Sequence, residues 1–209
     1  GLVDDLDTSF VIGHIFSGLL ELTPQMDVIP DLAQRWEILE GGRRYIFHLR
    51  EDARWSDGMP LTAHDFVYAW RRLLNPAKPQ SSLAELLYDI KGARAFHLGV
   101  ASGAESLGVR AVDPYTLEVE LEEPASYFLQ LMANPVVYPV PRHVVERCGA
   151  AWTELANLVV NGPFRVQGWQ PGESLTLVRN PEYAGRFSGN LGRVEFNFTP
   201  PSEWSVQVS

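Results

Sequence analysis

A strand, a tight turn and a capped helix follow one another between residues 45 and 75, and this arrangement constrains the fold more than any other segment. Apolar side chains recur at every second position over residues 45–50, which is typical of a half-buried β-strand. Asp57-Gly58 predicts a tight turn. Thr62 is a good helix N-cap, and Asp65 occupies the third position of a capping box. The segment therefore predicts a sheet with a helix packed close to it in sequence.

Strand-like segments flank turn signals in three places, which predicts three β-hairpins. Strands and helices alternate irregularly and no repeat is visible, so the prediction is an α+β (mixed α/β) fold rather than a regular βαβ array. No closing element is predicted after residue 200. The hairpins pair residues 36–39 with 45–50, 109–112 with 116–121, and 164–169 with 174–179, and residues 194–198 form a last strand.

Thr8 or Asp7 is predicted to cap a first helix, and helical spacing places Val11, Ile15 and Leu19 on one face of it. A second capping box, Ser82 with Glu85, predicts another helix. Two shorter helices are predicted over residues 126–132 and 141–148.

Composition excludes several classes of protein. Hydrophobic residues make up 45% of the chain, which argues against disorder. The net charge is −9 and no basic stripe is present, so no nucleic-acid partner is expected. No apolar run approaches the ~20 residues that span a bilayer, so no membrane-spanning segment is predicted. Cys148 is the single cysteine, which excludes an internal disulfide.

No motif for catalysis, metal binding or a cofactor is present. The five histidines do not share metal-ligand spacing, and Cys148 is predicted to be a small buried residue beside Val144. Nucleotide-binding and nucleophile-elbow motifs are absent. Adjacent acidic residues such as Glu122-Glu123 leave a hydrolase open as an alternative, although a surface role is common for such pairs. We expect no enzyme, no metal and no cofactor. Gly41, Gly42 and Gly162 are interpreted as turn or close-approach positions.

Several segments together resemble one family, the solute-binding proteins of peptide and nickel ABC importers (extracellular solute-binding family 5). The densest is YIFHLREDARWSDGMPLTAHDFVYAWRR at residues 45–72. At Ser17 the chain departs from the family, which usually has Glu there. The other matching segments are residues 16–19, 30–36, 107–121, 138–141, 161–164 and 179–183.

The resemblance implies a two-lobed receptor that closes on its ligand, of which this chain is an N-terminal part. It implies a partial lobe of the periplasmic-binding-protein type II kind with an inserted β/α subdomain. Residues 1–16 and 142–209 would belong to lobe I, and residues 17–141 would form the subdomain. The second lobe would be absent from this chain.

The resemblance also suggests ligand-binding positions. Asp4, Asp5 and Leu6 match the stretch whose backbone pairs with an extended peptide. Ser82 falls about where some peptide binders have a pocket tyrosine, and Asn134 aligns near another pocket position. A purely structural role is the alternative for each. The Trp55–Gly58 turn and the Asn161-Gly162-Pro163 segment are interpreted as fold elements.

The function implied is the solute-binding, and specifically peptide-binding, component of an ABC importer. Its partners would be a peptide or similar solute and an ABC permease, and the protein would be a monomer. Its compartment would be periplasmic or extracellular. The sequence leaves open whether the full-length protein carries a lipid anchor. The alternative is a ligand-sensing domain of a cytoplasmic regulator built on the same fold.

Overall fold

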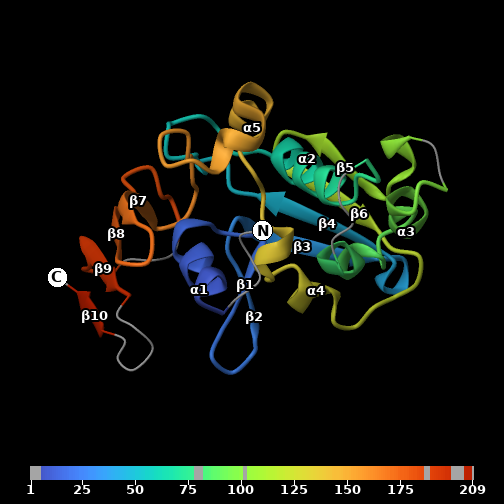
Figure 1. The fold of residues 1–209 in the computed structure, drawn as a ribbon. Coiled ribbons are helices and arrows are strands. Elements are labelled where there is room, and N and C mark those ends of the chain that lie inside the picture. The colour runs from blue at the N-terminus through green and yellow to red at the C-terminus, as the bar shows by residue number, and fades with distance from the viewer. Residues whose placement is uncertain (1–5, 78–81, 101–102, 186–188, 199–204, 209) are drawn as a thin grey trace. The chain divides into compact units, whose positions relative to one another are not determined.

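The computed structural model describes residues 6–77, 82–100, 103–185, 189–198 and 205–208. Their elements follow one another along the chain as Figure 1 shows. The chain divides into two compact units. Unit 1 consists of Gly1–Ser17, Asp52–Leu61 and His143–Ser209, and unit 2 consists of Gly18–Glu51 and Thr62–Arg142. Residues 52–61, predicted to lie in the subdomain, thus group with unit 1, while the assignment of segments to a lobe and a subdomain stays a prediction.

Unit 1 contains a four-stranded antiparallel sheet in the order β10-β9-β8-β7. The strands are β7 (Phe164–Gln170), β8 (Ser174–Arg179), β9 (Arg193–Asn197) and β10 (Ser205–Val208). The predicted hairpin of residues 164–169 and 174–179 is confirmed. The expectation of no closing element after residue 200 is wrong, because β10 pairs with β9.

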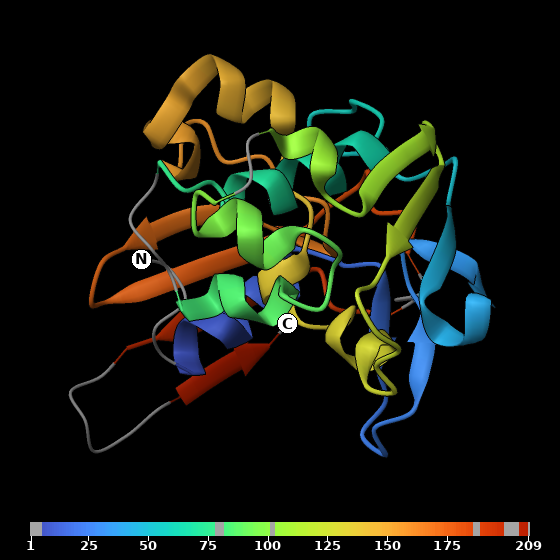
Figure 2. The ribbon, with the colours of Figure 1, turned by 90° about the vertical axis from the view of Figure 1, so that its right-hand side faces the viewer.

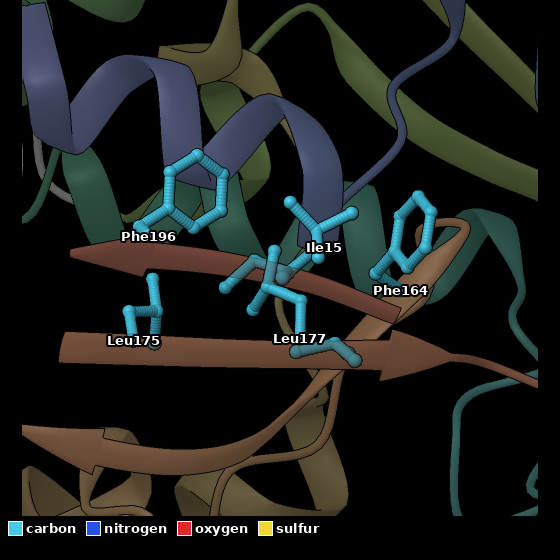
Figure 3. Packing of buried hydrophobic residues seen from close by; sticks show 7 residues of the cluster. Ile15, Phe164, Leu175, Leu177 and Phe196 are labelled. Atoms are coloured by element: carbon cyan, nitrogen blue, oxygen red, sulfur yellow. The ribbon is translucent and has the colours of Figure 1, made fainter. Parts of the chain in front are cut away.

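The core of unit 1 lies between this sheet and helix α1 (Leu6–Ile15). Alternate positions of β8 and β9 are buried, as expected for strands with one face against a core. In Figure 3, Ile15 lies between the rings of Phe196 and Phe164, above the strand that carries Leu175 and Leu177. Figure 2 shows the same relationship from the side, with α1 in blue against the orange and red strands. The buried members are Ile15, Val160, Phe164, Leu175, Leu177, Val194 and Phe196.

Helix α1 is shorter than its apolar spacing predicts. Val11 and Ile15 pack into the core of unit 1. Leu19 was expected on the same helical face, but α1 ends at Ile15 and Leu19 is fully buried in unit 2. The apolar residue at position 19 is therefore explained by burial in unit 2 and not by a place on the face of α1.

Unit 2 contains a second antiparallel sheet in the order β3-β4-β6-β5. The strands are β3 (Ala33–Leu39), β4 (Arg44–Leu49), β5 (Val109–Asp113) and β6 (Thr116–Glu120). Both predicted hairpins of this sheet are confirmed. Leu117 and Val119 are fully buried, and Glu118 and Glu120 alternate with them on the other face. A separate two-stranded pair is formed by β1 (Leu20–Leu22) and β2 (Val28–Pro30).

Helix α2 (Ala63–Leu73) contacts β5 and β6 (Figure 1). The predicted capping box is present, because the Thr62 backbone N–H donates to Asp65 Oδ2 at 2.9 Å. Phe66 and Trp70 are fully buried, and each burial contributes roughly 1.5–3 kcal/mol before entropy is subtracted. Trp70 Nε1 also donates to the Val137 carbonyl at 2.8 Å.

Short helices make up most of the remaining regular structure. In unit 2 they are the 3₁₀ helices η1 (Glu40–Gly42), η2 (Ser82–Leu87), η3 (Ala104–Ser106) and η4 (Pro135–Val137), with the α-helices α3 (Ala93–His97) and α4 (Phe128–Leu131). Helix α5 (Arg142–Cys148) and the 3₁₀ helix η5 (Gly149–Thr153) follow toward the C-terminus.

Candidate ligand-binding site

The predicted ligand-binding residues are divided between the two units. Asp4 and Asp5 lie outside the described residues, and Leu6 is the first residue of α1 in unit 1. Ser82 and Asn134 lie in unit 2. Among the described contacts, no hydrogen bond joins Ser82 to Asn134. The described structure therefore does not show the five residues as a single site.

Ser82 is exposed and begins the 3₁₀ helix η2. The predicted capping box placed Ser82 just before an α-helix, and this expectation is wrong. The backbone N–H groups of Tyr88 and Ile90 donate to the carbonyls three residues earlier, Glu85 and Leu87, each at 3.0 Å. Such bonds are typical of 3₁₀ geometry. The Ser82 side chain is left at the surface.

Asn134 is partly buried and has a clear local structural role. Its Oδ1 accepts the Val136 backbone N–H at 2.9 Å, which caps η4, and Pro135 occupies the first helical turn. The same short helix is tied to α2 by the bond from Trp70 to Val137. Within the described contacts, the Asn134 Nδ2 group makes no hydrogen bond. Its oxygen is thus committed to the fold, while no described hydrogen bond occupies its nitrogen.

Tyr138, the residue that follows η4, packs closely against Gly18. A Cβ atom at position 18 would come within 2.3 Å of the Tyr138 ring. Both residues belong to segments that carry the family resemblance, 16–19 and 138–141. The close packing is a sufficient reason for glycine at position 18. The family resemblance at Gly18 and Tyr138 therefore does not require either residue to contact a ligand.

Unit 1 contains a buried polar cluster that sequence reasoning described only as a fold element. Asn161 is 2% exposed, and its amide group makes two bonds to Ser17. Ser17 N donates to Asn161 Oδ1 at 3.2 Å, and Asn161 Nδ2 donates to Ser17 O at 3.0 Å. Gly162 N donates to Ile15 O at 2.9 Å. We call Asn161 and Gly162 the α1 clamp. The predicted close approach at Gly162 is confirmed.

The Trp55–Gly58 turn is joined to the residue before the clamp. Ser56 N donates to Val160 O at 2.7 Å, and Val160 N donates to Ser56 Oγ at 3.1 Å. Gly58 has a φ of 84°, which favours glycine. The predicted turn is confirmed, and its long-range bonds explain why residues 52–61 belong to unit 1.

Shifted pKa values arise at pairs that need no active site to explain them. A hydrogen bond to Glu120, 2.6 Å away, raises the pKa of Lys91. Hydrogen bonds from His48 and Arg35 lower the pKa of the Glu37 carboxyl. Burial raises the pKa of the Tyr45 hydroxyl. These groups belong to the sheet of unit 2 or its edges, so the shifts do not indicate an acid–base pair.

Metal-ligating side chains do not cluster in the described ranges of the chain. No group of three or more His, Cys, Asp or Glu side chains that could hold a metal lies together there. Cys148 is partly exposed, so its predicted burial beside Val144 is wrong, although Val144 itself is buried. No helix among the described residues is long and apolar enough to cross a bilayer.

Comparisons with known proteins agree on one family. The model for "Bacterial extracellular solute-binding proteins, family 5 Middle" matches residues 27–207. The chain is 41% identical over 196 residues to YgiS of Escherichia coli, a probable deoxycholate-binding periplasmic protein, covering 93% of this chain and 36% of the relative. It is 39% identical over 181 residues to the periplasmic oligopeptide-binding protein OppA of Salmonella typhimurium, covering 87% of this chain and 33% of the relative.

Solved structures show the same relationship. An oligopeptide-binding protein of Borrelia burgdorferi superposes with a TM-score of 0.89 at 33% identity, covering 96% of this chain and 40% of that one. OppA of Haemophilus influenzae in complex with the peptide RPPGFSPFR gives a TM-score of 0.80 at 35% identity, with coverage of 87% and 35%. The chain spans about a third of the length of the curated relatives it matches. The predicted mixed α/β fold of the periplasmic-binding-protein type is thereby confirmed, and the chain belongs to family 5 of the bacterial extracellular solute-binding proteins.

Proposed function

We propose that this chain is part of a receptor that binds a peptide outside the cytoplasm and delivers it to an ABC permease. The observation that carries the proposal is the likeness, over 87% of the chain, to a protein solved with a nonapeptide bound. The receptor grips and releases its solute without making or breaking a covalent bond. Differential affinity of the ligand for a closed state would drive closure.

Residues 4–6 are proposed to recognise the ligand through their backbone. Main-chain hydrogen bonds to an extended peptide give affinity that depends little on side-chain identity. Leu6 begins α1, so the proposed contact directly precedes a helix that packs on the core of unit 1. Asn134 would contribute its Nδ2 group, because its Oδ1 already caps η4. Ser82 is proposed as a weaker, surface contact.

A second candidate ligand is a bile acid. The relative at 41% identity carries the name of a probable deoxycholate-binding protein. A steroid carboxylate has no peptide backbone, so it could not use the strand-like pairing proposed for residues 4–6. The two candidates therefore predict different consequences of changing those residues.

The remaining properties follow from the receptor proposal. The protein would be a periplasmic or extracellular monomer, and its full-length form could carry a lipid anchor. Nothing in the comparisons supports the alternative of a cytoplasmic sensor domain.

Titration calorimetry on the protein expressed from its complete reading frame would test the proposal. Peptides of two to nine residues and deoxycholate would be titrated separately. We expect saturable binding of a peptide with a Kd in the micromolar range or below. Saturation by deoxycholate alone would assign the bile-acid function, and turnover of a bound peptide would contradict a receptor that does no chemistry.

A further inference from the structure

The α1 clamp holds backbone groups at the C-terminal end of α1. The last carbonyls of a helix have no partner within the helix. The Ile15 carbonyl receives the Gly162 N–H, and both backbone groups of Ser17 bond to the Asn161 amide. Asn161 and Ser17 are both nearly inaccessible to solvent and lie 144 positions apart in sequence. A side-chain amide thus bonds to Ser17 as a neighbouring strand would.

Helix α1 transmits this attachment to its first residue. Its ten residues span about 15 Å as a rigid element. In the second half of the helix, Ile15 is buried and Val11 is partly buried against the core of unit 1. The clamp and this packing thus hold one end of α1, and the helix carries Leu6 at the other.

We propose that Asn161 is a positioning residue for the ligand: its amide fixes the C-terminal end of α1 and thereby the placement of Leu6. The inference rests on the proposed function, because Leu6 is the predicted ligand residue that α1 carries. Asn161 does not touch the ligand in this proposal. It acts through the helix.

Asn180 provides a matched control within the same unit. It is also an asparagine with 2% exposure, and its Nδ2 donates to Gly162 O at 2.9 Å. Within the described contacts it makes no bond to α1. Replacing either asparagine by Ala removes a buried amide and leaves backbone groups without a partner, so both should lower stability. Asn180→Ala frees the Gly162 carbonyl but leaves the Gly162 N–H on Ile15 and the Asn161 amide on Ser17, so it should loosen α1 much less than Asn161→Ala does.

Hydrogen exchange of the complete protein, followed by mass spectrometry, would measure that loosening. In Asn161→Ala we expect the amides of α1 and Ser17 to exchange about tenfold faster or more, because two buried backbone groups lose their partner. In Asn180→Ala, exchange in α1 should stay within about twofold of the unaltered protein. Equal acceleration in the two variants would overturn the proposal.

The Asn161→Asp variant adds a readout that general destabilisation does not move. An ionised carboxylate can accept from Ser17 N but would face Ser17 O without a donor. A protonated carboxyl group offers both a donor and an acceptor. After correction for the intrinsic pH dependence of exchange, protection of α1 in this variant should recover as the pH falls. If protection did not recover, the two bonds between the Asn161 amide and the Ser17 backbone would not be what holds α1.

Peptide titration separates the clamp from the proposed function. If the unaltered protein binds a peptide, Asn161→Ala should weaken binding about three- to tenfold while Asn180→Ala should not. A loosened α1 with unchanged affinity would overturn the positioning role. If the unaltered protein binds no peptide, the proposed function fails, and exchange of the hydrogen-bonded amides of α1 alone decides whether Asn161 holds the helix that carries Leu6.

Discussion

Gly162 lies directly against the backbone of Ile15. Its N–H donates to the Ile15 carbonyl at 2.9 Å, and a Cβ atom at position 162 would come within 2.5 Å of the Ile15 carbonyl carbon. Both atoms that such a Cβ would meet first are backbone atoms, Ile15 C and Phe16 N. A side chain could turn aside, but the backbone of a packed helix end cannot.

Gly162→Ala should therefore lower the free energy of unfolding by about 3 kcal/mol, since it forces two backbone segments apart and strains the bond between them. Urea denaturation followed by circular dichroism would measure the change.

Gly13→Ala is the matched control. Gly13 lies within α1, is exposed and has no atom within 4 Å of a Cβ placed on it. Alanine favours the helix, so this change should raise the free energy of unfolding by about 0.5–1 kcal/mol. If the two substitutions had similar effects, close backbone approach would not be the reason for glycine at position 162.

Two fully buried tryptophans differ in the state of their indole N–H. Trp70 Nε1 donates to the Val137 carbonyl, whereas Trp55 Nε1 is buried and has no hydrogen-bond partner among the described residues. Trp70→Phe leaves a carbonyl without its donor, while Trp55→Phe removes an unsatisfied donor. We expect Trp70→Phe to cost about 1–3 kcal/mol more than Trp55→Phe in urea denaturation. Equal costs would show that Trp55 Nε1 has an acceptor in solution.

Asp113 should give the stability a measurable pH dependence. The Tyr115 backbone N–H, 2.8 Å from Asp113 Oδ1, is the main cause that lowers the pKa of this carboxyl below its ordinary value of 3.8. A group with a lowered folded pKa stabilises the fold above its unfolded pKa, and this contribution is lost as the pH falls through the folded pKa. Stability measured from pH 5 down to pH 2 should therefore decrease less steeply in Asp113→Asn.

Asp113→Asn keeps an oxygen that can accept from Tyr115, so it removes the titration while preserving the turn between β5 and β6. Asp113→Ala removes both the titrating carboxyl group and the oxygen that accepts from Tyr115. An NMR titration of the carboxyl carbon would measure the pKa directly, and a value at or above 3.8 would contradict the prediction.

Asn134 allows its structural and ligand roles to be separated. Asn134→Asp keeps the oxygen that caps η4 but replaces the Nδ2 donor, so stability should change little while ligand affinity falls if Nδ2 contacts the ligand. Asn134→Ala removes the cap and should cost about 1 kcal/mol. Thermal unfolding and calorimetry on the complete protein would measure the two effects. Unchanged affinity in Asn134→Asp would leave Asn134 with its capping role alone.

This 209-residue chain should bind peptide weakly or not at all by itself, because it spans about a third of the length of its relatives. In a two-lobed receptor much of the pocket would come from the opposite lobe. Calorimetry with the chain alone and with the complete protein would compare the two affinities. Tight binding by the chain alone would show that the described units contain a sufficient site.

Local signals account for the parts of the fold that could be predicted. The hairpin β3–β4 and helix α2 follow from period-two alternation, from Asp57-Gly58 and from the capping box at Thr62, all of which act over a few residues. Ser82 shows the limit of such signals. Its capping-box spacing is present, yet the segment forms a 3₁₀ helix.

The candidate site was less accessible to sequence reasoning. Asn134 was identified through the family resemblance, but only the structure shows that its oxygen caps η4 and its nitrogen has no bond within the described contacts. The partnership of Asn161 with Ser17 has no local signal, because the two residues are 144 positions apart. The Asn-Gly-Pro pattern indicated a close backbone approach without naming the segment approached.

The sequence by itself determined the family, through its matching segments, and the mixed α/β class with most hairpins and helices. The hairpins and helices could be predicted because backbone preferences and side-chain periodicity act over a few neighbouring residues. Only the tertiary structure decided that Leu19 is buried outside α1, that residues 52–61 belong with unit 1, and that β10 closes its sheet. These features depend on hydrogen bonds and packing between segments distant in sequence. Their energies exist only once the chain has brought those segments together.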